Sequence, residues 1–194
     1  LPDSIGFFYT AITQFLGFQN YGDEYKIMGL AAYGQHSNNY DMSKIIKIDD
    51  KEFYKINNKY IKMHSGGSAE KVFNSNVVID KWFKPEIEQL LGKSRKPNSK
   101  IKQSHMDIAR AVQTHFEKIS LECIKKLSKL VDTKNLCLSG GCALNGLLAG
   151  KIAKNTKFKN IYIPPASSDD GLSVGAAFYL WNNILNNKRT SPMK

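Results

Sequence analysis

The sequence has little of what several protein classes require. No apolar stretch in its 194 residues approaches the roughly 18 that a membrane-spanning helix needs, and no signal peptide is recognisable, so we expect no membrane partner. Cysteine is scarce, and the three cysteines, Cys123, Cys137 and Cys142, form no Cys-x-x-Cys pair. This odd set indicates free thiols in a reducing compartment, which predicts a cytoplasmic protein.

Arginine is also scarce. Only Arg95, Arg110 and Arg189 occur among 28 basic residues, so lysine carries most of the formal net charge of +11. The lysines are spread along the chain, and no segment interleaves arginine with aromatic residues as proteins that bind single-stranded nucleic acid do. An excess of Lys, Asn and Ile is also what an AT-rich genome encodes. We therefore expect no specific nucleic-acid partner.

The first half of the chain is predicted to hold two helices and a small sheet. Apolar residues recur at helical spacing from Ser4 to Phe18, and a second short helix is expected from Asp23 to Tyr33, ended by Gly34. Three runs rich in Ile, Tyr and Phe follow, separated by turn-prone Asp and Asn: Lys44 to Asp49, Glu52 to Asn57 and Lys59 to His64. These runs predict a β-meander inserted over residues 43–64.

The second half alternates between helix and strand. A long apolar stripe predicts a helix from about Ser104 to Val131, opened by a capping box of Ser104 and Asp107. The elements expected after it are a strand at 135–138, a helix at 143–154, a strand at 160–163 and a helix at 171–183. This order predicts parallel strands joined by crossover helices, and so an α/β fold.

The strongest local motif lies at the end of the first of these strands. The chain runs from the strand into Ser139, Gly140 and Gly141, and then into a helix that carries Asn145 near its start. Glycines allow the backbone to approach a ligand closely, and the free amides of a helix N-terminus favour a phosphate. The alternative is an ordinary tight turn, since the spacing matches neither the P-loop nor the dinucleotide fingerprint.

The second motif follows the second strand. Residues 164–171 contain the adjacent carboxylates Asp169 and Asp170, followed by Gly171. Ligands of parallel α/β sheets bind at the carboxyl ends of the strands, where such a pair can hold a metal ion. The alternative is that one of the two caps the helix that follows.

The third motif spans residues 22–34 and places Glu24 two positions before Lys26, ahead of small residues and glycines. Such a segment suits close packing against a ligand, with the two charged side chains as candidate catalytic groups. The alternative is an exposed ion pair beside a buried turn. None of the four histidines is assigned as a ligand, because they show no i,i+4 pairing.

Together these motifs resemble the O-carbamoyltransferases of nodulation-factor and antibiotic biosynthesis. The similarity covers nearly the whole chain and rests on five segments in the same order: Asp3 to Tyr9, Leu16 to Phe18, Glu24 to Ala31, Ser139 to Asn145, and Pro164 to Ala177. The resemblance implies a lobe of the actin-like ATPase superfamily, which includes the sugar kinases. Residues 1–194 would form part of its second lobe, with the β-meander as a small insertion.

The resemblance also implies a reaction. ATP and carbamoyl phosphate would give a carbamoyl-adenylate, whose carbamoyl group passes to the hydroxyl of a sugar or natural product. Ser139, Gly140, Gly141 and Asn145 would then bind the nucleotide. Asp169 would join two histidines as ligands of a divalent metal, often iron in that family. In the third motif, Glu24 and Lys26 would be the catalytic residues.

Two features of that family fall outside this sequence. Its metal-binding histidine pair is expected upstream, and its adenylate-forming domain downstream. Because the chain also begins with Leu1 rather than Met, we expect a fragment of a larger enzyme, inactive alone, whose partner is the remainder of the same polypeptide. The alternatives are the lobe of another actin-like ATPase or sugar kinase, or a non-catalytic nucleotide-binding fragment.

Overall fold

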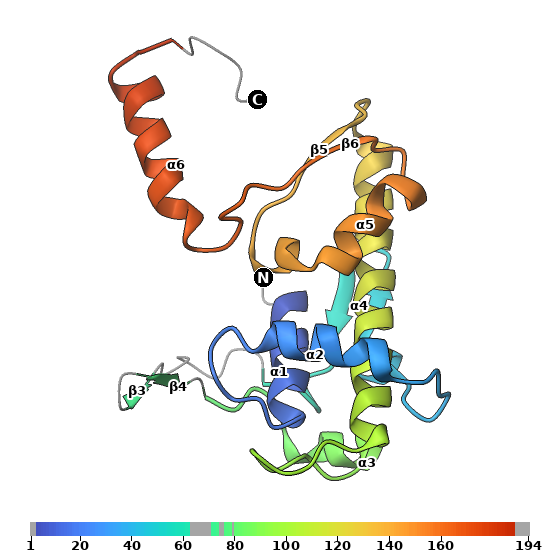
Figure 1. Ribbon diagram of the computed structural model, residues 1–194. Helices are drawn as coiled ribbons and strands as arrows, with labels where there is room; N and C mark the ends of the chain where they lie inside the picture. Colours follow the sequence, from blue (N-terminus) through green and yellow to red (C-terminus); the bar gives the residue numbers. More distant parts are fainter. Residues whose placement is uncertain (1–2, 63–70, 74–75, 79, 189–194) are drawn as a thin grey trace. The chain divides into compact units, whose positions relative to one another are not determined.

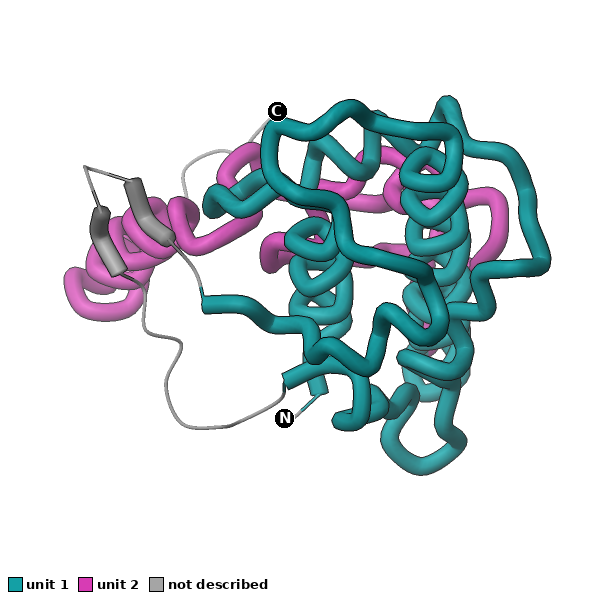
Figure 2. Tube along the Cα trace, turned by 90° about the horizontal axis from the view of Figure 1, so that it is seen from below, with its two compact units in different colours: residues 1–131 teal, residues 132–194 magenta. Residues whose placement is uncertain are grey.

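The computed structural model describes residues 3–62, 71–73, 76–78 and 80–188 (Figure 1). The chain divides into two compact units, Leu1–Val131 and Asp132–Lys194 (Figure 2), called unit 1 and unit 2 below. Helices and small sheets occur together, which confirms the predicted α/β class. Among the described helices, none combines the length and the apolar composition needed to cross a membrane.

Two helices predicted from periodicity form the core of unit 1. Helix α1 (Ile5–Phe15) buries Phe8, Ile12 and Phe15, whose i, i+4, i+7 spacing places them on one side. The second helix, α4 (Gln103–Leu130), buries a matching stripe made of Ile108, Ala109, Val112, Phe116 and Ile119. The two helices are in contact. Their facing stripes therefore exclude water from the centre of the unit.

The N-terminus of α4 differs from the prediction. The N-cap is Lys102, whose backbone N–H donates to Nδ1 of His105 at 3.0 Å, so the capping box of Ser104 and Asp107 is wrong. The Asp107 carboxylate instead accepts the backbone N–H of Gln35 at 2.7 Å and the side-chain amide of Gln103 at 2.9 Å. It is used to hold a distant loop to the helix, which no local pattern encodes.

The predicted second helix is confirmed in two parts. Helix α2 (Glu24–Leu30) continues into the 3₁₀ helix η1 (Ala31–Tyr33), and both contact α4. The chain then passes Gly34, where a Cβ atom would lie 2.2 Å from the carbonyl oxygen of Met106. Only glycine permits this approach, so the end of the helix is fixed against α4.

The expected β-meander is a two-stranded hairpin within the described residues. Strands β1 (Ile46–Asp49) and β2 (Phe53–Ile56) pair antiparallel, as predicted. The third run is not a strand over residues 59–62, while residues 63 and 64 lie outside the described residues. Asn57 starts a turn there by accepting the N–H of Lys59 at 3.0 Å, and Ile61 then bridges to Phe83 rather than to β2.

Short elements complete unit 1, and the sequence patterns did not reveal them. They are η2 (Met42–Lys44), strands β3 (Lys71–Phe73) and β4 (Asn76–Val78), which pair antiparallel, η3 (Pro85–Ile87) and α3 (Glu88–Leu91). Each has three or four residues. Such lengths are too short for a hydrophobic period to show.

Unit 2 contains the predicted parallel pair. Strands β5 (Asn135–Cys137) and β6 (Asn160–Tyr162) align Leu136 with Ile161. The 3₁₀ helix η4 (Gly141–Leu144) and helix α5 (Gly146–Asn155) connect them, and α6 (Gly171–Tyr179) continues into the π-helix η5 (Leu180–Ile184). A βαβ crossover of this kind brings the ends of both strands to one edge.

The connection between α4 and β1 predicts a dependence of stability on pH. Nε2 of His115 lies 2.7 Å from the carbonyl oxygen of Ile46. Burial, reinforced by Lys118, lowers the pKa of His115, while the contact with Ile46 and the charge of Asp41 oppose this shift. The unfolded state therefore binds a proton at this histidine more readily than the folded state does. The folded state keeps its full stability above the ordinary histidine pKa, and it loses stability as the pH falls through the lowered pKa of His115.

We predict that the free energy of unfolding decreases as the pH is lowered from about 7 to about 5. The free energy of unfolding of the His115→Gln variant should decrease less over the same interval. Glutamine keeps a hydrogen-bond donor but does not titrate. Denaturant unfolding of both proteins at the two pH values measures the difference. Equal decreases in the two proteins would contradict this account of His115.

Candidate functional site

The loops that follow β5 and β6 meet at the carboxyl edge of the parallel pair. The backbone N–H of Gly140 donates to the carbonyl oxygen of Ser167 at 2.6 Å, and the hydroxyl of Ser139 donates to the same oxygen at 3.1 Å. One carbonyl of the second loop thus holds two residues of the first. The structure therefore brings the glycine motif and the aspartate motif together at the edge where ligands of parallel sheets bind.

The two glycines of the first loop differ in backbone conformation and surroundings. Gly140 has φ of +94°, a conformation that side chains disfavour, although no atom lies within 4 Å of a Cβ placed there. At Gly141 a Cβ atom would be 3.7 Å from the Ser168 hydroxyl, which is ordinary contact. Both residues are exposed, as is Ser139. The backbone of this turn is therefore open to a ligand.

Asn145 has a structural role that the sequence did not predict. It is buried, and its Oδ1 accepts the N–H of Leu148 at 3.0 Å, which makes it the N-cap of α5. Helix α5 therefore begins at Gly146 rather than at the predicted Ala143. The short 3₁₀ helix η4 begins at Gly141, within the glycine turn, and ends at Leu144, just before this cap.

The second loop is tightly folded up to α6. A Cβ atom on Gly171 would lie 2.1 Å from the carbonyl oxygen of Ala166, so the loop closes on itself only because residue 171 is glycine. Ser167 is buried, and its hydroxyl has no hydrogen-bond partner among the described residues. Asp169 and Asp170 are exposed. The side chain of Asp170, the N-cap residue of α6, forms no cap hydrogen bond.

The donor set of this edge is incomplete for a transition metal. No group of three or more His, Cys, Asp or Glu residues suited to a metal ion occurs in the part of the chain that the structure describes. Asp169 therefore fits a metal only as a single exposed carboxylate, and adjacent Asp170 is the one other acidic residue of this loop. Transition-metal sites need further nitrogen, sulfur or oxygen ligands.

Glu24 and Lys26 lie on α2 in unit 1, and each has its own partner. Oε1 of Glu24 accepts the Thr10 hydroxyl at 2.5 Å, and Nζ of Lys26 lies 2.6 Å from Oδ1 of buried Asp23. The hydrogen bond to Asp23 raises the pKa of Lys26, although burial opposes it. The sequence reasoning missed Asp23, which the i,i+3 spacing to Lys26 could have revealed.

The glycine at the start of α6 is a test of the loop geometry. We predict that Gly171→Ala weakens the local structure by about 1–3 kcal/mol, because the new methyl group meets a backbone carbonyl that must move. Gly175→Ala, later in the same helix where no atom lies within 4 Å, should stabilise it by about 0.5–1 kcal/mol. Hydrogen-exchange protection over residues 166–180 measures both. Similar protection in the two variants would refute the close approach.

Comparison with known proteins identifies relatives of the chain. It is 33% identical over 190 residues to an uncharacterized protein, sll1178, of Synechocystis sp., covering 97% of this chain and 29% of the relative. Nodulation protein NolNO of Sinorhizobium fredii and nodulation protein NolO of Bradyrhizobium diazoefficiens are each 29% identical over 182 residues. These matches cover 94% of this chain but 23% and 29% of the two nodulation proteins.

The chain thus spans less than a third of the length of each of these relatives. The family model described as the carbamoyltransferase N-terminus matches residues 1–178, which include all the motifs discussed above. This match confirms the resemblance found in the sequence. The chain belongs to the carbamoyltransferase family and carries that family's N-terminal region.

Proposed function

We propose that the protein takes part in ATP-dependent transfer of a carbamoyl group to an acceptor hydroxyl. Membership of the family supports the transferase class. The observation that carries the site is the exposed glycine turn, fixed by the Ser167 carbonyl beside Asp169 at the carboxyl edge of β5 and β6. The donor would be carbamoyl phosphate, activated as carbamoyl-adenylate, and the acceptor a sugar or natural product. The βαβ crossover supports an actin-like ATPase lobe.

The nucleotide would bind over the glycine turn. Ser139, Gly140 and Gly141 expose backbone at this edge, and the turn leaves room beside Gly141 for a ligand. Asn145 would act here mainly by fixing the start of α5, whose N-terminus favours phosphate charge. Two hydrogen bonds to the Ser167 carbonyl already hold the turn in this conformation.

The transfer step needs a proton acceptor, and we assign this role to the third motif. The acceptor oxygen attacks the carbamoyl carbon, the bond from this carbon to the adenylate oxygen breaks, AMP leaves, and the hydroxyl proton passes to a base. The raised pKa of Lys26 keeps it protonated, so it would act as a cation and not as a base. Glu24 already accepts a hydroxyl hydrogen bond from Thr10, and it is our candidate for the proton acceptor.

A divalent metal, iron by resemblance, would polarise the carbamoyl oxygen when bound. Asp169 would supply one carboxylate ligand. Because the described residues hold no complete donor group, the other ligands would come from residues outside the described part.

The remainder of a longer polypeptide would also cover α6. All residues of this helix are at least partly exposed, although most are apolar.

The glycine turn gives the first test of the nucleotide site. In the full-length enzyme, Gly141→Val should lower the affinity for a non-hydrolysable ATP analogue by about tenfold or more, since its branched side chain fills the space beside the turn. Gly150→Val, at a helical position with open surroundings, should leave the affinity unchanged. Calorimetric titration measures both. Unchanged affinity in a folded Gly141→Val protein would show that the nucleotide does not bind at this turn.

The adjacent carboxylates give the second test. In the full-length enzyme, Asp169→Asn should lose bound metal and most carbamoyl transfer, because the carboxylate is the proposed ligand. Asp170→Asn should retain both and lose at most about 0.5–1 kcal/mol of stability through the helix dipole. Elemental analysis and a transfer assay on the two variants separate the roles. Metal loss only in Asp170→Asn would show that the wrong aspartate is assigned.

A further inference from the structure

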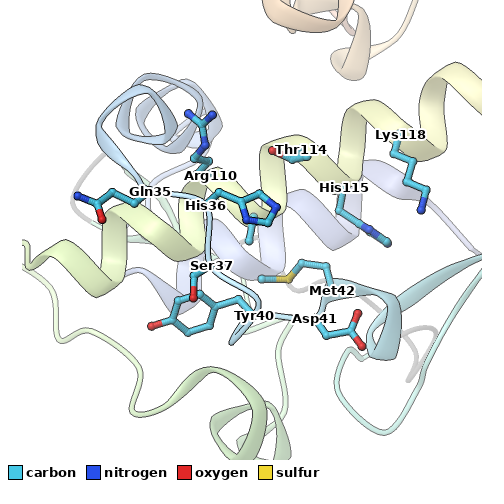
Figure 3. A pocket seen from close by; sticks show the side chains of 11 residues that line it. Gln35, His36, Ser37, Tyr40, Asp41, Met42, Arg110, Thr114, His115 and Lys118 are labelled. Carbon is cyan, nitrogen blue, oxygen red and sulfur yellow. The ribbon is translucent and has the colours of Figure 1, made fainter.

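A pocket of about 170 Å³ lies within unit 1, apart from the residues assigned above (Figure 3). One wall is the polar side of α4, and the other is the loop that runs from Gln35 after η1 into η2. Figure 3 shows the side chains of His36, Tyr40 and Asp41 on the loop side. None of the motifs discussed above contributes to this lining. The pocket therefore needs its own explanation.

The wall on α4 is a row of hydrogen-bond donors. Arg110, Thr114 and Lys118 follow one another at four-residue spacing, which places them along one face of the helix (Figure 3). All three are exposed. Within the described part of the chain, the side chains of these three residues form no hydrogen bond and no ion pair. Their donors are therefore available to a ligand.

The opposite wall is held in place by contacts that its backbone makes. The N–H of Gln35 donates to the Asp107 carboxylate at 2.7 Å, and Gly34 packs directly on the Met106 carbonyl of α4. The loop ends at η2, which contacts α4 and is capped by Asp41, whose Oδ1 accepts the N–H of Ser43 at 3.0 Å. Contacts at both ends thus fix the loop. The pocket is already formed without a ligand, which lowers the cost of binding.

The charges of the lining favour an anion. Arg110 and Lys118 are cations, and Asp41 is the one acidic residue among the lining residues. Hydrogen bonds from the Ser43 hydroxyl and backbone lower the pKa of Asp41, so it stays ionised but is occupied as the cap of η2. A metal ion is not favoured, because no group of three or more His, Cys, Asp or Glu residues suited to one occurs among the described residues.

We propose that this pocket binds a small ligand through a phosphate group, seated over Thr114 between the side chains of Arg110 and Lys118. These two residues are about 12 Å apart along the helix axis, eight residues at about 1.5 Å each. The Lys118 side chain would reach back toward the N-terminus and the Arg110 side chain would extend toward the C-terminus, so that both meet at the midpoint, where the Thr114 hydroxyl supplies a further donor. A phosphate accepts several charge-assisted hydrogen bonds at once. The ligand is either inorganic phosphate or a phosphate monoester.

The test is a titration of the ¹⁵N-labelled chain, at constant ionic strength, with inorganic phosphate and with glycerol phosphate. Amide signals of residues 35–41 and 110–118 should shift with saturation. The double variant Arg110→Gln, Lys118→Gln should weaken the affinity by about tenfold or more. Lys129→Gln changes an exposed lysine on the same helix outside the pocket, and it should stay within about twofold of the original affinity.

Two further results decide the class of ligand. Tighter binding of glycerol phosphate than of inorganic phosphate supports a monoester, and the reverse order supports free phosphate; either order supports the site. Malonate, a dianion without phosphorus, should bind at least about tenfold more weakly. Equal binding of malonate, equal loss in Lys129→Gln, or shifts confined to residues outside the pocket would each overturn the proposal. Unchanged signals outside the pocket in the double variant show that it is folded.

Discussion

The packing of α1 against α4 is the contact on which the rest of unit 1 depends. The Tyr9 ring meets Phe116 edge-on at 5.2 Å, and its hydroxyl donates to Gln113 at 2.7 Å, so an apolar and a polar contact fix the same pair of helices. Thr10, the next residue on α1, holds Glu24. The candidate catalytic segment and the donor row on α4 are thus both positioned from one buried interface.

A single carbonyl has the corresponding role in unit 2. The Ser167 oxygen accepts two hydrogen bonds from the glycine turn, and the tight loop that carries it exists because Gly171 has no side chain. The two loops are consequently coupled, and a change in one should displace the other. This coupling places a glycine motif and an aspartate motif, about thirty residues apart in the chain, at the same edge of the parallel pair.

Some features were predictable because their cause is local. Helical periodicity revealed α1 and α4, and the alternation of short apolar runs with helices revealed the parallel strands. Other features have distant causes. Asp107 resembles a capping residue but binds the backbone of Gln35, and Ile61 resembles part of a meander but bridges to Phe83. In each case a partner far away in the sequence competed successfully with the local pattern.

The sequence by itself determined the family and the identity of the motif residues, because these depend only on residue types and their order. It also determined the main helices, because periodicity is a local property. Only the tertiary structure decided how the side chains are used: that Asn145 caps a helix, that Lys26 is paired with Asp23, and that a loop forms a pocket with Arg110 and Lys118. The role of each of these side chains depends on which segments meet in space, and hydrophobic packing determines which segments meet.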